Sequence, residues 1–387
     1  MSARSTGPEH GPVQTPSDGS QGNPSSNPDS VLAEARRRVD TIDDQLLALL
    51  DQRAEQARAI ARFKRSHGMA LHDPEREADV LSRLEAKASE APHGLFPRRS
   101  VRSVFREVIS ACLAVEQPIS AAYLGPPGTF THMAARAAFG LAAQYVEAAT
   151  IPGVFDAVVR GRATYGVAPI ENSSEGGVTF TLDNLLDTDL LIRQELVLDV
   201  AQCLVGLTHD MGSILRVYSH PQALAQCRRW LGRNLPHAQL VVADSTTAAA
   251  RQAADDPAAA AVAGRLAAEL SGLRVLREAI QDQAQNATRF IVLATQDAPP
   301  TGRDKTSLVF STRDERGALR QILEVFDKAG INLTRIESRP ARSKRWEYVF
   351  FTDLEGHRTS PELSGALEQL GELCQMTKVL GSYPRSD

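Results

Sequence analysis

The strongest constraint on the fold is the stretch 31–64, which contains neither proline nor glycine and repeats apolar residues at helical spacing. The apolar positions are Val39, Ile42, Leu46, Leu49, Leu50, Ala57, Ile60 and Phe63. This pattern predicts one helix about 50 Å long. Two shorter helices are predicted over 75–88, after an N-cap at Asp73-Pro74, and over 98–115. Such a three-helix region cannot bury so long a helix alone, so we expect a homodimer or higher homo-oligomer.

The overall charge excludes several classes of partner. The 387 residues include 43 Lys and Arg against 47 Asp and Glu, so the net charge is only −4. This balance argues against nucleic-acid and membrane-surface binding, and no apolar run approaches the roughly 18 residues that span a bilayer. The cysteines form no C-x-x-C pair, which predicts reduced thiols in a cytoplasmic protein, with neither a zinc site nor a disulfide framework. They are Cys112, Cys203, Cys227 and Cys374.

Changes in composition divide the chain into domains, as its length requires. Residues 1–30 are rich in Pro, Ser and Gly, which predicts a disordered N-terminal tail before a helical domain over 31–117. Short apolar runs alternate with Ala-rich helical stretches over 120–295, which predicts a two-lobed α/β domain of the periplasmic-binding-protein-like kind. A linker is predicted over 296–304. The β-α-β-β-α-β order predicted over 305–387 is the ferredoxin-like arrangement.

Within the predicted long helix, Arg53 and Lys64 are separated by eleven residues, which amounts to about 20° of rotation and about 16 Å of rise. Both side chains therefore project from one face with a gap that fits a small dicarboxylate. Arg36 lies about 25 Å before Arg53 and about 100° around the axis, so it reaches the same ligand only from a partner's helix. From spacing alone, a solvated surface face is the simpler interpretation.

Lysine is rare in this chain, since only six of the 43 basic residues are Lys. They are Lys64, Lys87, Lys305, Lys328, Lys344 and Lys378. A lysine therefore marks a position where a compact ammonium is used instead of a planar guanidinium.

The helical region resembles the all-helical class of chorismate mutase. The resemblance rests on RRRVDTIDDQLLALLDQR in the first helix, on Lys64, and on HDPEREADVLSRL at the second helix. It implies that Arg53, Arg76 and Lys64 bind the carboxylates and the ether oxygen of the substrate, with Lys64 as a catalytic residue. It also implies that Arg36 arrives from the other protomer.

The same resemblance implies that Asp73 and Glu77 lie near the substrate hydroxyl, although Asp73 fits a helix cap equally well. Cys112 and Glu116 stand where many members of the class have Ser and Gln. The implied reaction is a Claisen rearrangement, in which the enzyme stabilises negative charge growing on the ether oxygen. Glu116 assists there as a catalytic residue only when protonated. We therefore expect mutase activity that declines as pH rises, with a flatter profile for Glu116→Gln; identical profiles would refute this role.

The central region resembles prephenate dehydratase across almost its whole length. After a GPPGT turn, the resemblance rests on PIENSSEGG, YSHPQALAQC, DSTTAAA and QNATRF, in that order. It implies that Thr288 is the general acid, while four further residues hold the substrate or lie close to it: Glu171, Asn172, Ser219 and Gln226. Arg289 is either a partner of a substrate carboxylate or a member of a structural ion pair.

The implied dehydratase reaction removes carbon dioxide and hydroxide from a cyclohexadienol and forms an aromatic ring. It needs a proton for the departing hydroxyl and a rigid grip on the rest of the substrate. A threonine hydroxyl is a weak acid in water, so its use implies a desolvated site. His132 and His220 lie within motif segments, and we interpret them as packing or supporting residues, because the resemblance places no catalytic histidine at either position.

The C-terminal region resembles an ACT domain, a module that commonly binds an amino-acid effector at a dimer interface. The resemblance rests on Gly317-Ala318-Leu319 at the first helix and on Glu337-Ser338-Arg339-Pro340 at the second strand. It implies a phenylalanine site formed by seven residues: Gly317, Ala318, Leu319, Asn332, Leu333, Glu337 and Ser338. From composition alone, these segments are an ordinary turn and strand end.

Together these resemblances imply a bifunctional enzyme that converts chorismate through prephenate to phenylpyruvate, is feedback-inhibited by L-phenylalanine, and needs no metal, nucleotide or redox cofactor. One alternative is a monofunctional dehydratase with a non-catalytic helical dimerisation domain. Loss of chorismate consumption in Lys64→Ala, with prephenate turnover spared, would decide against this alternative. The other alternative is a non-enzymatic ligand sensor, because two lobes with an ACT domain also form a binding layout. Thr288→Ala should leave ligand binding intact in either case, but it should abolish product formation only if the protein is an enzyme.

Overall fold

The computed structural model describes residues 28–69, 73–90, 95–116, 118–174, 176–283, 286–313, 315–340 and 348–386. The chain divides into two units between Gln56 and Ala57, inside the first helix. The predicted tail over 1–30 lies outside the described residues, except that the first helix already begins at Pro28. Within the described ranges, no helix combines the length and the apolar character needed to cross a membrane.

Three helices form the N-terminal region, as predicted. They are α1 (Pro28–Ser66), α2 (Pro74–Glu90) and α3 (Arg98–Glu116). In the first unit, eight large apolar side chains of α1 are 41–61% exposed: Val31, Leu32, Val39, Ile42, Leu46, Leu47, Leu49 and Leu50.

The third helix is attached to the domain that follows it. α3 packs against α2, burying Leu81 and Ile109. From its other side, Ser110 Oγ donates a hydrogen bond to the carbonyl of Phe139 at 2.7 Å, and Arg106 donates to the carbonyl of Ala137 at 3.0 Å. The sequence patterns did not predict this attachment, because both acceptors are backbone groups.

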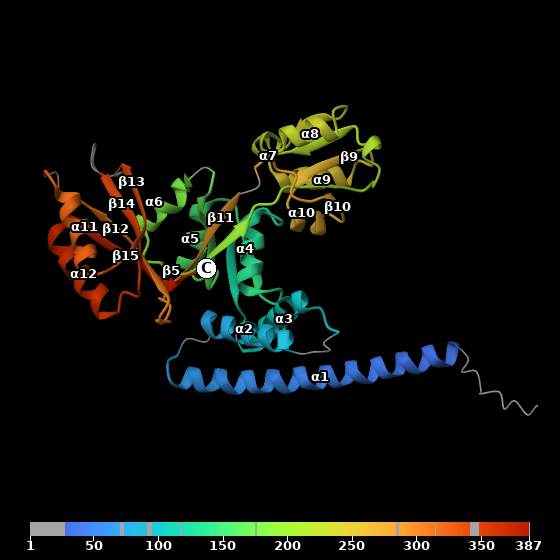
Figure 1. The fold of residues 1–387 in the computed structure, drawn as a ribbon, viewed down its shortest axis with the longest axis horizontal. Coiled ribbons are helices and arrows are strands. Elements are labelled where there is room, and N and C mark those ends of the chain that lie inside the picture. Colours follow the sequence, from blue (N-terminus) through green and yellow to red (C-terminus); the bar gives the residue numbers. More distant parts are fainter. Residues whose placement is uncertain are drawn as a thin grey trace, which may run out of the picture. The chain divides into compact units, whose positions relative to one another are not determined.

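The central domain has two lobes, each with its own mixed sheet, which confirms the predicted architecture (Figure 1). The first sheet has the order β2-β1-β3-β11-β5, with β4 paired to β3. Its strands are β1 (Ser120–Leu124), β2 (Gln144–Ala148), β3 (Tyr165–Asn172), β4 (Gly176–Gly177), β5 (Leu191–Asp199) and β11 (Ala287–Ala294). The helices of this lobe are α4 (Phe130–Phe139), α5 (Ile151–Val159) and α6 (Thr179–Asp187).

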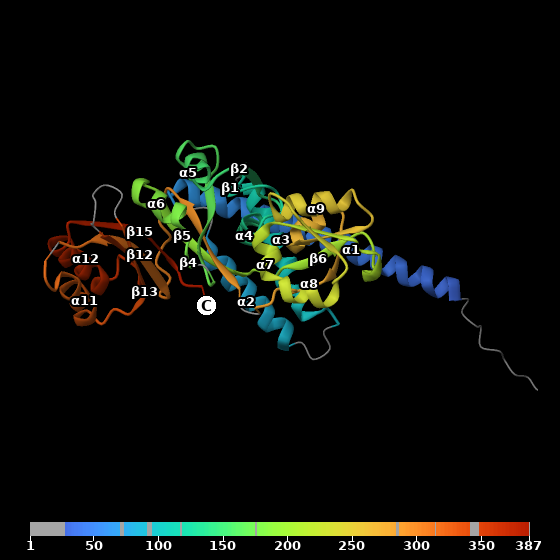
Figure 2. The same ribbon diagram turned by 90° about the horizontal axis from the view of Figure 1, so that it is seen from above.

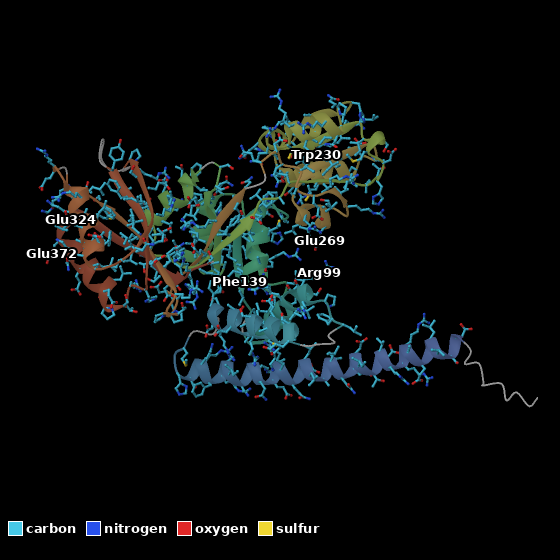
Figure 3. All side chains as sticks on the ribbon, in the orientation of Figure 1. Arg99, Phe139, Trp230, Glu269, Glu324 and Glu372 are labelled. Carbon is cyan, nitrogen blue, oxygen red and sulfur yellow. The ribbon has the colours of Figure 1, made fainter. Side chains whose placement is uncertain are left out.

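The second sheet has the order β10-β6-β9-β7-β8. Its strands are β6 (Cys203–Gly206), β7 (Arg216–Ser219), β8 (Gln239–Val242), β9 (Ala259–Ala263) and β10 (Arg274–Arg277). Its helices are the 3₁₀ turn η1 (Met211–Ser213), α7 (Pro221–Gln226), α8 (Arg228–Asn234), α9 (Thr246–Ala254) and α10 (Arg265–Leu270). Phe139 is buried in the core of the first lobe, and the partly buried Trp230 packs against the core of the second lobe (Figure 3).

Two chain segments connect the lobes, one between β5 and β6 and the other between β10 and β11. They are hydrogen-bonded to each other, because Val200 N–H donates to the carbonyl of Asn286 at 2.7 Å and Ile280 N–H donates to that of Gln202 at 2.8 Å. Paired crossovers of this kind hold two lobes on either side of a cleft.

The C-terminal domain has the predicted β-α-β-β-α-β order. Its antiparallel sheet runs β13-β14-β12-β15, with α11 and α12 covering one face (Figure 1). The elements are β12 (Asp304–Ser311), α11 (Ala318–Lys328), β13 (Leu333–Pro340), β14 (Tyr348–Glu355), α12 (Pro361–Leu373) and β15 (Met376–Pro384).

The first lobe and the C-terminal domain share one hydrophobic core, which the sequence did not predict. Ile192 and Leu293 of the lobe pack in the same cluster as Phe351 and Tyr383 of the C-terminal domain. β5 and β15 lie side by side in both views (Figure 2). Even Ala298, in the predicted linker, is buried in this cluster.

Candidate active sites

A cavity of about 350 Å³ lies between the two lobes of the central domain. The first lobe supplies Phe130, Asn172 and Thr288, and the crossover segments supply Val200, Gln202 and Asn286. The second lobe supplies His220, Gln222, Ala223, Gln226, Asp244, Ser245 and Thr246. Three residues that the sequence analysis selected, Asn172, Gln226 and Thr288, therefore line one cavity.

Asn172 and Thr288 are neighbours on adjacent antiparallel strands, β3 and β11. Asn172 Nδ2 donates a hydrogen bond to Thr288 Oγ1 at 2.8 Å. The orientation of the amide follows from its oxygen, because Asn172 Oδ1 accepts from the backbone N–H of Ser174 at 2.9 Å and only an oxygen can do so. Thr288 Oγ1 is therefore an acceptor of this bond, which leaves the hydroxyl hydrogen of Thr288 for another acceptor.

Sequence reasoning missed several lining residues, of which Asn286 and Gln202 make the clearest contacts. Asn286 Oδ1 accepts the second hydrogen of the Asn172 amide at 3.0 Å, so Asn172 is held by two partners. Gln202 Nε2 donates to Gln226 Oε1 at 3.3 Å. Asn286 lies within the QNATRF motif, which is the signal that indicates it, whereas Gln202 lies in none of the motifs.

Among the described residues that line the cavity there is neither a lysine nor an arginine. Favourable potential for an anion comes instead from helix N-termini, where backbone N–H groups point outward. α4 starts beside Phe130 and α9 starts at Thr246, both of which line the cavity.

The two histidines of the motif segments have structural contacts. His132 Nδ1 accepts a hydrogen bond from the N–H of Gly128 at 3.1 Å, and the ring stacks on Tyr123. Burial, assisted by the nearby Arg136, lowers the pKa of His132 below its ordinary value. His220 caps the first turn of α7, where its Nδ1 accepts from the N–H of Gln222.

Ser219, Glu171 and Arg289 are not among the residues that line the cavity. Ser219 is fully buried, and its hydroxyl donates to the carbonyl of Val262 at 2.6 Å. Glu171 and Arg289 are also cross-strand neighbours. Glu171 directly precedes Asn172 on β3, and Arg289 directly follows Thr288 on β11. Because side chains alternate along a strand, this second pair faces the opposite side of the sheet.

On that opposite side, Arg289 forms ion pairs with three carboxylates. Its guanidinium lies 2.7 Å from Asp353, 3.0 Å from Glu171 and 3.3 Å from Glu195. Burial disfavours the charged form of Arg289, but Asp353 and its other acidic neighbours outweigh this and raise its pKa. Burial likewise opposes ionisation of Asp353, yet Arg289 and a hydrogen bond from Ser307 hold the pKa of Asp353 below its ordinary value.

In the helical region, Lys64 and Asp73 lie close together. The Lys64 ammonium is 3.9 Å from the carboxylate of Asp73, which also accepts the backbone N–H of Arg76 at 3.1 Å. Asp73 thus caps α2 while facing Lys64. Glu77 is half-buried on α2, and Cys112 is buried on α3.

For the remaining predicted mutase residues we give only the helix on which each one lies. Arg36 and Arg53 lie on the single continuous helix α1, and Glu116 is the last residue of α3. The side chain of Glu116 lies outside the described residues.

Two of the predicted effector segments reach the core of the C-terminal domain through Leu319 and Leu333. Gly317 has φ of +84° before α11, a conformation that glycine adopts without strain. Leu319 and Leu333 pack against the same cluster, which brings the starts of α11 and β13 to one core. Glu337 and Ser338 point to opposite faces, because Glu337 contacts Arg335 whereas Ser338 is exposed.

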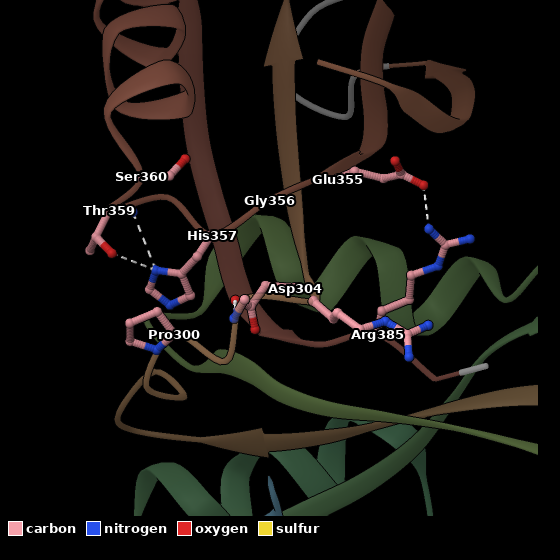
Figure 4. Close-up of a pocket in the computed structure, with 10 residues that line it drawn as sticks. Pro300, Asp304, Glu355, Gly356, His357, Thr359, Ser360 and Arg385 are labelled. Atoms are coloured by element: carbon pink, nitrogen blue, oxygen red, sulfur yellow. Dashed lines mark hydrogen bonds and ion pairs between the residues drawn. The ribbon is translucent and has the colours of Figure 1, made fainter. Parts of the chain in front are cut away.

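A second cavity, of about 530 Å³, lies beside the start of α12 (Figure 4). Its polar side chains are engaged with one another or with the backbone. His357 contacts Thr359 and the carbonyl of Ala298, while Glu355 pairs with Arg385. No group among the described residues gathers the His, Cys, Asp or Glu side chains that a metal ion would need. We assign no function to this cavity.

Three known families match the chain: chorismate mutase type II over residues 35–117, prephenate dehydratase over 121–298 and the ACT domain over 306–372. The chain is similar to bifunctional chorismate mutase/prephenate dehydratases, with 46% identity to that of Aquifex aeolicus and 43% to that of Pseudomonas aeruginosa. Each comparison covers 92% of this chain and 98% of the relative. Among solved structures, it is similar to prephenate dehydratase from Arthrobacter aurescens in complex with L-phenylalanine. The TM-score is 0.63 and the identity 37%, covering 69% of this chain and 90% of that one.

Proposed function

The chain belongs to the family of bifunctional chorismate mutase/prephenate dehydratases, and from its residues we propose how each activity is carried out and regulated. It is an enzyme of phenylalanine biosynthesis with an ACT regulatory domain. We propose domain limits of 31–117 for the mutase, 120–295 for the dehydratase and 305–387 for the ACT domain, with 296–304 between them, and a cytoplasmic location.

In the dehydratase, Thr288 is the general acid. The C–C bond to the ring carboxylate breaks to release carbon dioxide, its electron pair becomes a ring double bond, and the ring C–O bond breaks. Thr288 Oγ1 gives its proton to the departing hydroxyl, which leaves as water, and the threonine is reprotonated from solvent. The observation that carries this role is the hydrogen bond from Asn172 to Thr288, because a donor to Oγ1 stabilises the negative charge left behind.

The rest of the cavity holds the substrate. Gln226, oriented by Gln202, presents its amide to the polar groups of the substrate. Asn172 lines the cavity and orients Thr288, because its two amide hydrogens go to Thr288 and Asn286. Because the described part of the lining contains no lysine or arginine, the carboxylates of prephenate face the starts of α4 and α9. The Ser219 hydroxyl acts by holding β7 to β9, and we assign Glu171 and Arg289 to the ion pairs described above rather than to substrate contact.

In the mutase, Lys64 donates to the ether oxygen of chorismate and to one carboxylate. Arg53 and Arg76 bind carboxylates, Asp73 and Glu77 lie near the hydroxyl, and Cys112 and Glu116 complete the site from α3. Arg36 is supplied by a second copy of the chain. The exposed apolar side chains of α1 support a homodimer, because a second α1 would cover them.

L-Phenylalanine inhibits the dehydratase by feedback. The effector site consists of Gly317, Ala318, Leu319, Asn332, Leu333, Glu337 and Ser338. Its support is the common core reached by the starts of α11 and β13, together with the L-phenylalanine complex of the similar dehydratase.

The deciding experiment supplies chorismate to the purified enzyme and follows prephenate and phenylpyruvate with and without L-phenylalanine. The proposal expects both products in sequence, and less phenylpyruvate when phenylalanine is present. Prephenate turnover without chorismate consumption would instead support a monofunctional dehydratase with a helical dimerisation domain. Binding of ligands without any product would support a sensor.

A further inference from the structure

The catalytic pair of the dehydratase shares its two strands with a set of buried charges. Asn172 and Thr288 face the cavity, while their chain neighbours Glu171 and Arg289 face the ACT domain. A change in the position of either outer side chain therefore acts on the backbone that also carries the catalytic pair. On each strand, the cavity-facing residue and the outward-facing residue are adjacent in the sequence.

The outer charges form one connected group, which we call the interdomain ion network. Its acidic members are Glu171, Glu195, Glu337 and Asp353, and its basic members are Arg289, Lys305 and Arg335. Four of these side chains are at most 12% exposed: Glu195 is 1% exposed, Asp353 is 4%, and Arg289 and Lys305 are each 12%. In such surroundings the loss of one partner leaves a charge without compensation, so the network responds strongly to small changes.

Arg335 links the two ends of this network. Its guanidinium lies 3.3 Å from Glu171, next to the catalytic Asn172, and also pairs with Glu337 in the predicted effector segment. Glu337 also contacts the strand pair β3 and β4 directly, at Gly177. The space beside Gly177 is occupied by the Glu337 carboxylate, and Gly177 is the strand partner of Glu171.

We propose that Arg335 is a positioning residue that transmits the state of the effector segment to the catalytic pair, through its simultaneous contacts with Glu337 and Glu171. The proposal rests on the proposed function, in which phenylalanine binds at the segment containing Glu337. Binding that moves the Glu337 carboxylate alters the hold of Arg335 on Glu171 and thereby the position of the neighbouring Asn172, which donates to Thr288. Coupling of this kind is reciprocal, so a ligand in the cavity also changes the affinity for phenylalanine.

The test is Arg335→Gln in the full-length enzyme, with Arg339→Gln as the matched control. Both arginines lie on the same face of β13, but Arg339 approaches Asp183 on α6 instead of a carboxylate on β3 or β11. For Arg335→Gln without effector we expect kcat and KM for prephenate within about twofold of wild type, because Glu171 keeps its ion pair with Arg289 and Asn172 keeps its bonds to Asn286 and Ser174. Mutase activity should be unchanged. The phenylalanine concentration for half-inhibition should rise by about tenfold or more. The control should keep the wild-type inhibition.

Calorimetry separates coupling from effector binding. In Arg335→Gln, phenylalanine should still bind, but its affinity should no longer change when phenylpyruvate occupies the cavity, whereas wild type and Arg339→Gln should show that change. Wild-type inhibition of Arg335→Gln, or complete loss of phenylalanine binding in that variant, would overturn the proposal. If phenylalanine does not inhibit the wild-type enzyme, the feedback inhibition in the proposed function is wrong. That result differs from wild-type inhibition persisting in Arg335→Gln, which contradicts only the role of Arg335.

A second variant keeps the proposal testable if Arg335→Gln does not fold. In Gly177→Ala, the new methyl group occupies the place of the Glu337 carboxylate and displaces it from Arg335 while leaving both charges in the chain. The same weakened inhibition is expected, with basal turnover retained. Unchanged inhibition in Gly177→Ala would contradict the route through Glu337.

Discussion

Replacing Thr288 with valine tests the assignment of the general acid with almost no change of shape. The substitution removes the hydroxyl that accepts the hydrogen bond from Asn172 at 2.8 Å. Asn172 keeps its bond to Asn286 at 3.0 Å but loses its second acceptor, so the cost in folding free energy should be about 1–3 kcal/mol. A domain of ordinary stability, about 5–15 kcal/mol, remains folded after such a loss.

The effect of Thr288→Val on turnover should be far larger. A positioned general acid contributes about 10²–10⁴ in rate, which corresponds to about 3–5 kcal/mol in activation free energy. We therefore expect kcat for prephenate to fall by that factor, while conversion of chorismate to prephenate continues at the wild-type rate. Phenylpyruvate formation and chorismate consumption, measured on the same preparation, give both numbers.

The matched control is Thr181→Val. Thr181 is also a buried threonine of the first lobe, and its hydroxyl donates to the carbonyl of Pro169 at 2.6 Å, but it does not line the cavity. Thermal unfolding should show a similar loss of stability in both variants, with kcat reduced only in Thr288→Val. A kcat for Thr288→Val within tenfold of the control would refute the assignment of Thr288 as the acid.

Three further predictions concern other parts of the chain. Lys64→Ala should abolish chorismate consumption and spare prephenate turnover; parallel loss of both would count against separate sites. Gly381→Ala should lower the free energy of unfolding by about 1–3 kcal/mol in denaturant titrations, because at φ of +146° its Cβ would overlap the carbonyl of Ile192. The lowered pKa of His132 means that its contribution to stability is complete above the unfolded pKa of about 6.5 and is lost as pH falls toward the folded value. Thermal stability of His132→Phe should therefore depend less on pH between about 7 and 5 than that of wild type, and equal slopes would argue against this contribution.

Most of the secondary structure was readable from local patterns. The absence of Pro and Gly over 31–64 predicted a single helix, and α1 runs over Pro28–Ser66. The Asp73-Pro74 start of α2 was equally clear, because capping depends on neighbours in the chain. The motif segments also selected Asn172, Gln226 and Thr288, which line one cavity, since each motif lies at the end of a strand or the start of a helix facing the cleft.

Tertiary structure decided which partner each face of a strand meets. Alternation along β3 and β11 implies that Glu171 and Asn172 point to opposite sides, but it cannot reveal that the far side is the ACT domain. The sequence motif likewise selected Ser219 but could not show which group its hydroxyl contacts. The hydroxyl donates to the carbonyl of Val262 in the neighbouring strand β9. Asn286 and Gln202 became recognisable only through the groups that they contact.

The rare lysines show what the sequence determined and what it left open. Their scarcity marked Lys64, and the fold uses two others to join domains: Lys305 binds Glu195, and Lys378 donates to carbonyls near the end of α6, including that of Leu186 at 2.8 Å. A local pattern identifies an unusual residue. The partners of Lys305 and Lys378 lie 110 and 192 positions away in the chain, and only packing of the two domains around a common core brings these groups together.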